Sequence, residues 1–197
     1  MEVTTFLKEN FPNLKLEPPL FYNWPIGIRY EIGMPNRTDL TSYLQGCYKR
    51  AITLFDEINE IDDQIVMVID VFNKKVGSRN ILPYLKDKKN KRVRLEHVLM
   101  EELVVHRFSF VGTKNEIYYK QLVKKICDKD FYSFMRKKDY IVYFINLDKK
   151  TIYYLYDDRG CDIIASDRNN LRHLYEKYNE WILDYDREEI DKIFHDN

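Results

Sequence analysis

Two apolar runs of strand length constrain this chain most strongly. They are YIVYFINL at residues 140–147 and TIYYLY at residues 151–156, joined by a short polar link. Both runs are apolar on both faces, which is typical of strands inside a sheet rather than at its edge. CDIIA at residues 161–165 predicts a third strand, and DDRG at residues 157–160 lies where a tight loop would join the two. This third of the chain is therefore expected to form consecutive strands joined by turns.

Three earlier segments also have strand character. GIRYEIG alternates three apolar residues with Arg29 and Glu31, which predicts a half-buried strand with one charged face. QIVMVIDVF and VVHRFSFVG are mostly apolar and of strand length. Within residues 73–103 the pattern is weaker, and LEHVLMEEL fits either a helix or the edge of a sheet. The expected strands are residues 27–32, 64–72, 104–111, 140–146, 151–156 and 161–165.

Helical spacing accounts for much of the first half of the chain. VTTFLKENF predicts a short opening helix that Pro12 ends, and residues 16–27 contain three prolines that favour an extended, irregular path. Thr38 and Asp39 form a plausible start for the clearest helix, because an acidic residue there favours the positive end of the helix dipole. Its apolar stripe comprises Leu40, Tyr43, Leu44, Cys47, Ala51, Leu54, Phe55 and Ile58.

Capping residues predict three later helices. The expected starts are Thr113 with Glu116, then Ser166 or Asp167, then Asp186 with Glu189. Their inner sides would carry Ile117, Leu122 and Ile126; Leu171, Leu174, Tyr175 and Tyr178; and Ile190, Ile193 and Phe194. Together the patterns predict an α+β fold, with a single mixed, mainly antiparallel sheet of five to six strands and helices packed on it. Residues 1–197 would form a single domain.

Composition argues against several classes of protein. The 32 Lys and Arg residues are balanced by 32 Asp and Glu residues, which disfavours a nucleic-acid binder. The N-terminus lacks the pattern of a signal peptide, and no apolar run approaches the ~18 residues of a membrane span. A cytoplasmic protein is therefore expected. Cys47, Cys127 and Cys161 are odd in number and far apart, which predicts reduced thiols rather than disulfides.

The DDRG segment permits two interpretations. Asp157 is a common first residue of a turn and Gly160 can supply a positive φ, so turn chemistry alone explains both. Alternatively, the carboxylates of Asp157, Asp158 and Asp162 could gather at one end of the sheet and hold a divalent cation. No histidine or second acidic motif lies nearby in the sequence. We favour a turn that can also take part in binding.

Familiar catalytic and cofactor motifs are missing from the sequence. His97, His106, His173 and His195 have no metal-ligand spacing, and the glycines form no phosphate-binding loop. Cys161 could act as a nucleophile beside His173, but a cysteine that opens a strand is more often a small buried apolar residue. The basic run 86–94 is typical of a solvated surface, with contact to an acidic partner or nucleic acid as the alternative. We expect no metal and no cofactor.

Four segments carry a family resemblance that covers nearly the whole chain. They are FPNLKLEPPLFYNWPIGIRYEIG, YKRAITLFDEI, YFINLDKKTIYYLYDDRGCDII and LYEKYNEWILDYDREEIDKIF, within which FYNWPIGIRYEIG, YDDRGCD and WILDYDREEID are the most specific. In these segments the chain resembles an uncharacterised family of small Gram-positive bacterial proteins, known as a domain of unknown function. Residues 73–103 match least well. Members of the family look like small proteins found beside secreted-toxin genes, several of which act as immunity proteins, and the resemblance implies no catalytic residue.

Two functions from different classes remain. The first is a non-catalytic protein-binding protein, such as an intracellular immunity protein that neutralises a toxin. The second is a metal-dependent hydrolase or nuclease that uses Asp157, Asp158 and Asp162. The richness in tyrosine and the balanced charge favour the first, since both suit a contact surface. Its expected contact residues are Asp157, Asp158, Arg159, Tyr185 and Asp186, and its expected partner is a protein rather than nucleic acid or a membrane.

Overall fold

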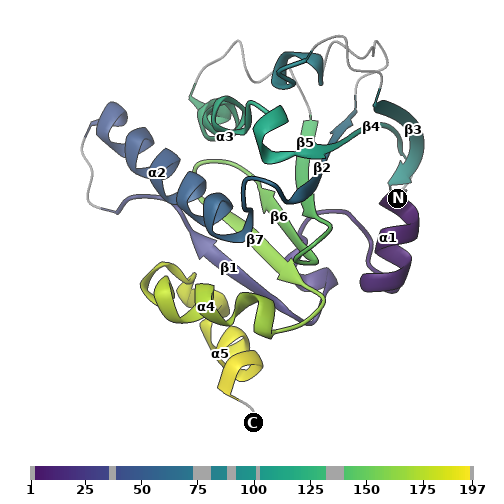
Figure 1. Ribbon diagram of the computed structural model, residues 1–197. Coiled ribbons are helices and arrows are strands. Elements are labelled where there is room, and N and C mark those ends of the chain that lie inside the picture. Colours follow the sequence, from purple (N-terminus) through teal and green to yellow (C-terminus); the bar gives the residue numbers. More distant parts are fainter. Residues whose placement is uncertain are drawn as a thin grey trace.

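The computed structural model describes residues 3–35, 39–72, 81–87, 92–100, 103–131 and 140–195. Within them, one seven-stranded sheet has the order β1-β7-β6-β5-β2-β4-β3, and every pairing is antiparallel (Figure 1). The strands are β1 (Gly27–Glu31), β2 (Gln64–Val71), β3 (Val93–Met100), β4 (Leu103–Thr113), β5 (Tyr140–Asn146), β6 (Thr151–Leu155) and β7 (Gly160–Ala165). The α+β class and the single sheet are confirmed, but the described strands form an antiparallel sheet rather than the predicted mixed one.

All six predicted strands are present, but the predicted total of five to six is wrong because β3 adds a seventh. This strand lies in the segment whose pattern fitted either a helix or a sheet edge. It occupies an edge of the sheet, and most of its side chains on both faces are exposed. Exposure on both faces permits Arg94, Glu96 and His97 among the leucines, which hides the alternation that reveals a half-buried strand.

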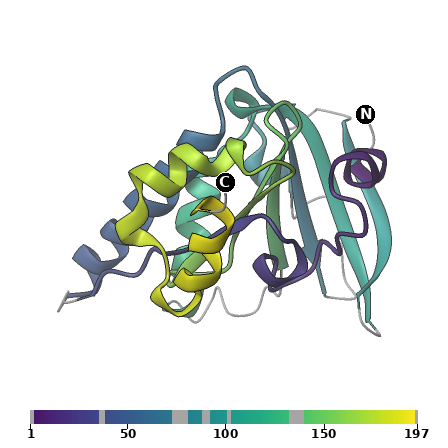
Figure 2. The same cartoon turned by 90° about the horizontal axis from the view of Figure 1, so that it is seen from below.

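Helices cover both faces of the sheet. α2 (Leu40–Ile58), α3 (Tyr119–Cys127), α4 (Asn169–Lys177) and α5 (Arg187–His195) lie on one side, and α1 (Val3–Asn10) lies on the other (Figure 2). Short 3₁₀ turns span Phe21–Asn23, Leu82–Tyr84, Lys114–Glu116, Asp128–Asp130, Asn179–Trp181 and Asp184–Asp186. Among the described residues, no helix is both long enough and apolar enough to cross a membrane.

Alternation along the strands divides the buried residues into two clusters. Met67 and Phe144 pack with the buried residues of α2, α3, α4 and α5. Val68 and Tyr143 point to the opposite face, where they pack with Phe6 of α1. A central strand must therefore be apolar at nearly every position, which is why the runs at β5 and β6 lack a polar face.

The predicted helix starts are correct in different degrees. Asp39 caps α2 by accepting a hydrogen bond of 2.8 Å from the amide of Ser42. Thr113 and Glu116 form the predicted capping box, but the box opens a 3₁₀ turn that precedes α3. Asp186 lies at the start of α5, yet its carboxylate accepts hydrogen bonds from Tyr22 and Arg29. This carboxylate therefore joins distant segments rather than only closing a helix end.

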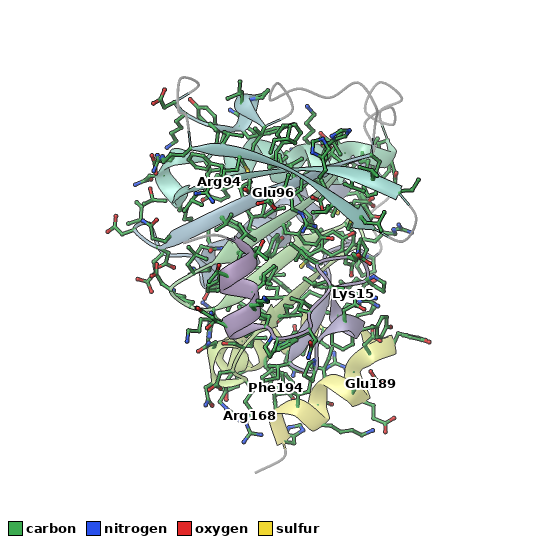
Figure 3. All side chains as sticks on the ribbon, turned by 90° about the vertical axis from the view of Figure 1, so that its right-hand side faces the viewer. Lys15, Arg94, Glu96, Arg168, Glu189 and Phe194 are labelled. Carbon is green, nitrogen blue, oxygen red and sulfur yellow. The ribbon has the colours of Figure 1, made fainter. Side chains whose placement is uncertain are left out.

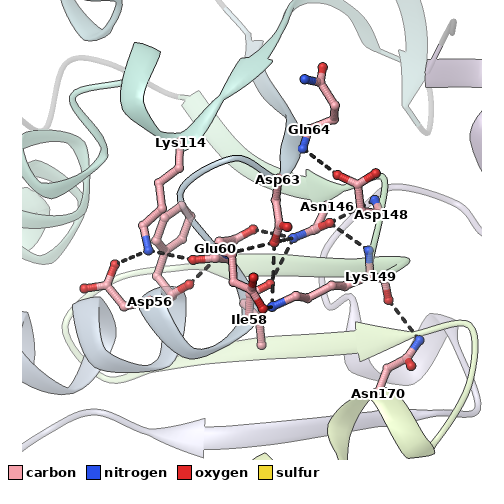
Figure 4. Close-up of polar contacts among 12 residues, drawn as sticks. Asp56, Ile58, Glu60, Asp63, Gln64, Lys114, Asn146, Asp148, Lys149 and Asn170 are labelled. Atoms are coloured by element: carbon pink, nitrogen blue, oxygen red, sulfur yellow. Dashed lines mark hydrogen bonds and ion pairs between the residues drawn. The ribbon is translucent and has the colours of Figure 1, made fainter.

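A buried asparagine fastens α2 to the sheet (Figure 4). Nδ2 of Asn146 donates to the carbonyl of Ile58 at 3.0 Å and to Oδ2 of Asp63 at 2.7 Å. Its Oδ1 accepts from the amides of Asp148 at 3.0 Å and Lys149 at 2.8 Å. One side chain thus joins the end of α2, the start of β2 and the turn between β5 and β6.

Candidate functional site

Arg29 is the centre of a network that joins three distant parts of the chain. It lies on β1 directly opposite Asp162 of β7, and its Nε is 2.9 Å from Oδ1 of that residue. Its Nη1 contacts Oδ2 of Asp186 at 3.1 Å and the hydroxyl of Tyr22 at 3.0 Å. The Tyr22 hydroxyl in turn donates to Oδ1 of Asp186 at 2.7 Å. Residues 22, 29, 162 and 186 belong to three of the sequence segments that carry the family resemblance.

The N-terminal segment is held to this network by its backbone and its rings. The amide of Phe21 donates to Oδ2 of Asp162 at 3.0 Å. The guanidinium carbon of Arg29 lies 5.6 Å from the ring centre of Phe21 and 4.7 Å from that of Tyr22. A cation at this distance from an aromatic face is attracted to it. The proline-rich segment, expected to be irregular, is therefore fixed in place just before β1.

Electrostatics favour the charged form of Arg29. Burial lowers the pKa of its guanidinium, but the hydrogen bond and the charge of Asp162 outweigh burial and raise the pKa above its ordinary value. The hydrogen bond to Asp186 raises the pKa of Tyr22, because the donated proton is held by a carboxylate. Both groups therefore keep their protons at neutral pH. Burial raises the pKa of the Asp162 carboxyl, although the hydrogen bond and the charge of Arg29 oppose this shift.

A groove of about 460 Å³ lies beside the network, between residues 21–25 and α5. Its described lining comprises Phe21, Tyr22, Asn23, Trp24, Pro25, Glu189 and Ile193. Figure 3 views this side of the molecule, with Glu189 projecting from α5. The indole nitrogen of Trp24 donates to the carbonyl of Ala165 at 2.7 Å, so the floor of the groove is anchored to β7.

Two tyrosines are exposed at this site. Tyr22 is 50% exposed although its hydroxyl is fixed by Asp186 and Arg29, and Tyr185, the neighbour of Asp186, is 86% exposed. We call the surface formed by Tyr22, Asn23, Trp24, Tyr185 and Glu189 the tyrosine surface. It combines aromatic rings, an amide and a carboxylate, which suits contact with another macromolecule.

The predicted contact residues fall into two groups. Asp157, Asp158 and Asp186 are buried, at 5%, 5% and 3% exposure, and each accepts hydrogen bonds from within the chain. Arg159 and Tyr185 are exposed. The three carboxylates therefore orient neighbouring groups, whereas the arginine and the tyrosine are accessible to a partner.

DDRG forms the predicted hairpin loop between β6 and β7. Oδ1 of Asp157 accepts from the amide of Arg159 at 2.8 Å, as expected for an aspartate that starts a turn. The predicted positive φ of Gly160 is wrong, since no described glycine has one. A Cβ at this position would instead lie 2.7 Å from the carbonyl oxygen of Tyr30 and 2.5 Å from the hydroxyl of Tyr156. The position requires glycine because other atoms approach it closely.

The aspartates of the alternative metal site have separate partners. Asp157 pairs with Arg159, Asp162 pairs with Arg29, and Oδ2 of Asp158 accepts from the hydroxyl of Tyr43 at 2.6 Å. Among the described residues, no three His, Cys, Asp or Glu side chains lie close enough to hold a metal ion together. The geometry therefore offers no specific observation in favour of the hydrolase alternative.

Cys161 and His173 lie in different environments. Cys161 is fully buried on β7, and burial raises the pKa of its thiol. His173 is exposed on α4. An activated thiol needs a lowered pKa and an accessible position, so Cys161 has the properties of a buried apolar residue. Of the basic run 86–94, only residues 86–87 and 92–94 lie within the described part, where Arg92 pairs with Glu116.

Arg29 and Tyr22 were not predicted as site residues. Arg29 was noted only as part of a charged strand face, and Tyr22 only as part of a proline-rich segment. The available signal was their position inside the FYNWPIGIRYEIG segment, together with a lone arginine between two apolar strand residues.

Comparison with known proteins places these observations in a family. The uncharacterized protein YnaE of Bacillus subtilis (strain 168) is 28% identical over 214 residues, covering 94% of this chain and 99% of the relative. No solved structure matches the chain significantly. The resemblance to an uncharacterised bacterial family is confirmed at this level. The chain belongs to the family described as Domain of unknown function (DUF3885), whose model matches residues 3–186.

Proposed function

We propose that this protein acts by binding another protein through the tyrosine surface, without catalysis. Neutralisation of a toxin domain, as by an immunity protein, is the specific form of this proposal. The observation that carries it is a fixed, half-exposed Tyr22 that lines a groove, together with an 86% exposed Tyr185 next in sequence to Asp186, which accepts from the Tyr22 hydroxyl. An exposed ring that is already fixed loses little conformational entropy on binding.

The hydrogen bonds of Tyr22 support its role as an anchor. Its hydroxyl donates to Asp186 and accepts from Arg29, whose charge is itself held by Asp162. Residues that dominate binding energy are enriched in tyrosine, tryptophan and arginine and tend to be rigid and centrally placed. Tyr22 is a tyrosine held rigid by its hydrogen bonds, and Trp24 contributes a second ring from the same segment.

The charged residues support specificity rather than affinity. Glu189 lines the groove, and Arg159 is exposed on the hairpin loop between β6 and β7. The carbonyl of Arg159 accepts from the amides of Ile32 and Gly33, which places this loop beside the end of β1. Opposite charges at the rim of a contact surface speed encounter and align the two partners.

The test is affinity capture from the native cell with immobilised protein. Wild type and a Tyr118→Ala control should retain the same protein in stoichiometric amount, whereas Tyr185→Ala should lose it. Tyr118 is 37% exposed at the start of α3, so the control removes an exposed tyrosine from outside the tyrosine surface. Tyr22→Phe, which keeps the ring but loses the hydrogen bonds, should weaken retention without abolishing it.

The toxin form has a separate test. A sensitive cell that expresses the captured toxin should grow with wild-type protein and fail to grow with Tyr185→Ala. Protection would require a dissociation constant below about 10 nM, or roughly −11 kcal/mol of binding free energy. Hydrolysis of nucleotides or nucleic acid by the purified protein, lost on Asp158→Ala, would instead support the metal-dependent enzyme.

A further inference from the structure

The two edges of the sheet differ in whether another segment of the chain pairs with them. At one edge, Tyr30 of β1 forms an isolated bridge with Ile182, and the amide of Leu183 donates to the carbonyl of Arg29 at 2.9 Å. The segment before α5 thus occupies the outer side of β1. At the other edge, no described residue pairs with the outer side of β3, which is eight residues long.

The β3–β4 hairpin also carries exposed apolar side chains. Leu95 is 49% exposed, Leu99 is 69% exposed and Val104 is 61% exposed. Leu99 lies opposite Val104, and Leu95 lies opposite Phe108, so these residues share the face of the sheet that α2 and α3 cover further along. Long, apolar edge strands are templates for pairing, and folded proteins usually shield them.

The charges on β3 discriminate between the registers in which β3 strands of two copies could pair. Arg94 and Glu96 are both exposed and lie two residues apart, on the opposite face from Leu95 (Figure 3). If two copies pair antiparallel with Leu95 on the two-fold axis, Arg94 of each copy lies opposite Glu96 of the partner subunit. An axis at residue 94 or residue 96 would instead place two like charges opposite each other. Opposite charges across a strand pair stabilise it, and like charges destabilise it.

We propose that β3 pairs with β3 of a second copy of this chain, with Leu95 on the axis. The pairing is isologous, so every contact occurs twice. It joins the two sheets into one continuous sheet, with Leu95 opposite Leu95 of the partner subunit and Val93 opposite His97 of the partner subunit. The formal net charge of zero at pH 7 means that the two copies approach without overall repulsion.

Charge reversal at β3 provides the test. Arg94→Glu and Glu96→Arg should each place like charges opposite each other, and each should raise the dimer dissociation constant at least about tenfold. An equimolar mixture of the two variants should restore the dimer, because both pairs then become Glu opposite Arg. Sedimentation equilibrium on the full chain measures the dimer dissociation constant of each variant and of the mixture. Glu188→Lys on α5 is the control for a charge reversal away from β3.

Leu95→Ser should also weaken the dimer, because Leu95 lies on the axis, with circular dichroism showing that the fold is unchanged. A wild-type chain that stays monomeric up to about 100 µM would overturn the proposal. So would a dimer that survives both charge reversals, or a mixture that does not recover. The outcome is independent of the proposed partner: Arg94→Glu should still capture it through the tyrosine surface.

Discussion

Arg107 and Asp70 form a two-pronged ion pair across β4 and β2. Nε of Arg107 lies 2.8 Å from Oδ1 of Asp70, and Nη2 lies 2.7 Å from Oδ2. The arginine side chain is 13% exposed and the carboxylate is fully buried. Burial lowers the pKa of the Arg107 guanidinium, but the hydrogen bonds and charge of Asp70 outweigh burial and raise it. Each charge is therefore tolerated only because the other is present.

Removing one partner should be far more harmful than removing both. Arg107→Met should lower the free energy of unfolding by about 3–5 kcal/mol, because the buried Asp70 carboxylate is left without a partner. The double variant Arg107→Met with Asp70→Leu should recover most of that loss. Urea denaturation measures both values, and equal losses in the single and double variants would contradict the account.

Gly160→Ala should lower the free energy of unfolding by about 1–3 kcal/mol through overpacking. The new methyl group would meet the backbone carbonyl oxygen of Tyr30 at 2.7 Å, and a backbone atom within β1 cannot move aside as a side chain can. The matched control is Gly33→Ala, where the nearest atom would lie at 3.4 Å and φ is not positive. Thermal melting should show a large shift for residue 160 and a small one for residue 33.

Asn146→Ala should lower the free energy of unfolding by about 2–4 kcal/mol, since the buried carbonyl of Ile58 and the part-buried amide of Asp148 lose a partner. Asn170→Ala is the control because the Asn170 side chain donates a hydrogen bond of 2.8 Å to the carbonyl of Lys149. Its loss should be about 1 kcal/mol. Similar losses in the two variants, measured by urea denaturation, would show that Asn146 does not organise this end of the sheet.

Local sequence patterns were sufficient to predict the elements that have whole faces buried. The apolar runs of β5 and β6 and the stripe of α2 were recognised because a strand with two buried faces and a helix with one each leave a regular pattern. β3 was not recognised, because an exposed edge tolerates Arg94, Glu96 and His97 and loses that regularity. The hairpin at DDRG was predicted, but the reason for Gly160 was not, since the crowding atoms belong to Tyr30 and Tyr156.

The site was harder to predict because its contacts are distant in sequence. Arg29 and Asp162 are 133 residues apart, and Arg29 and Asp186 are 157 residues apart. A charge pattern shows that carboxylates and guanidiniums are present but not which of them pair. Asp157, Asp158 and Asp186 were therefore predicted as contact residues, although the fold buries them. Tyr185, also predicted as a contact residue, is exposed.

Buried tyrosines should make the protein sensitive to alkali. Burial raises the pKa of Tyr30, Tyr143 and Tyr153 above the ordinary value of about 10. Each therefore contributes stability that is fully present below the unfolded pKa and is lost as pH rises toward the folded pKa. Above about pH 10 the free energy of unfolding should fall by about 1.4 kcal/mol per pH unit for each such tyrosine.

Tyr143→Phe separates this effect from the loss of an ordinary hydrogen bond. No described residue offers the buried Tyr143 hydroxyl a hydrogen-bond partner, so its removal should leave stability at neutral pH unchanged or raise it by about 1 kcal/mol. Tyr153→Phe should instead lower it, because the Tyr153 hydroxyl donates to the carbonyl of Ala51 at 3.0 Å. In both variants the free energy of unfolding should fall less steeply with pH above about pH 10 than in wild type. Urea denaturation measures this free energy, and tyrosinate absorbance reports the ionisation of the phenols. A slope equal to that of wild type would mean that these phenols ionise before the chain unfolds.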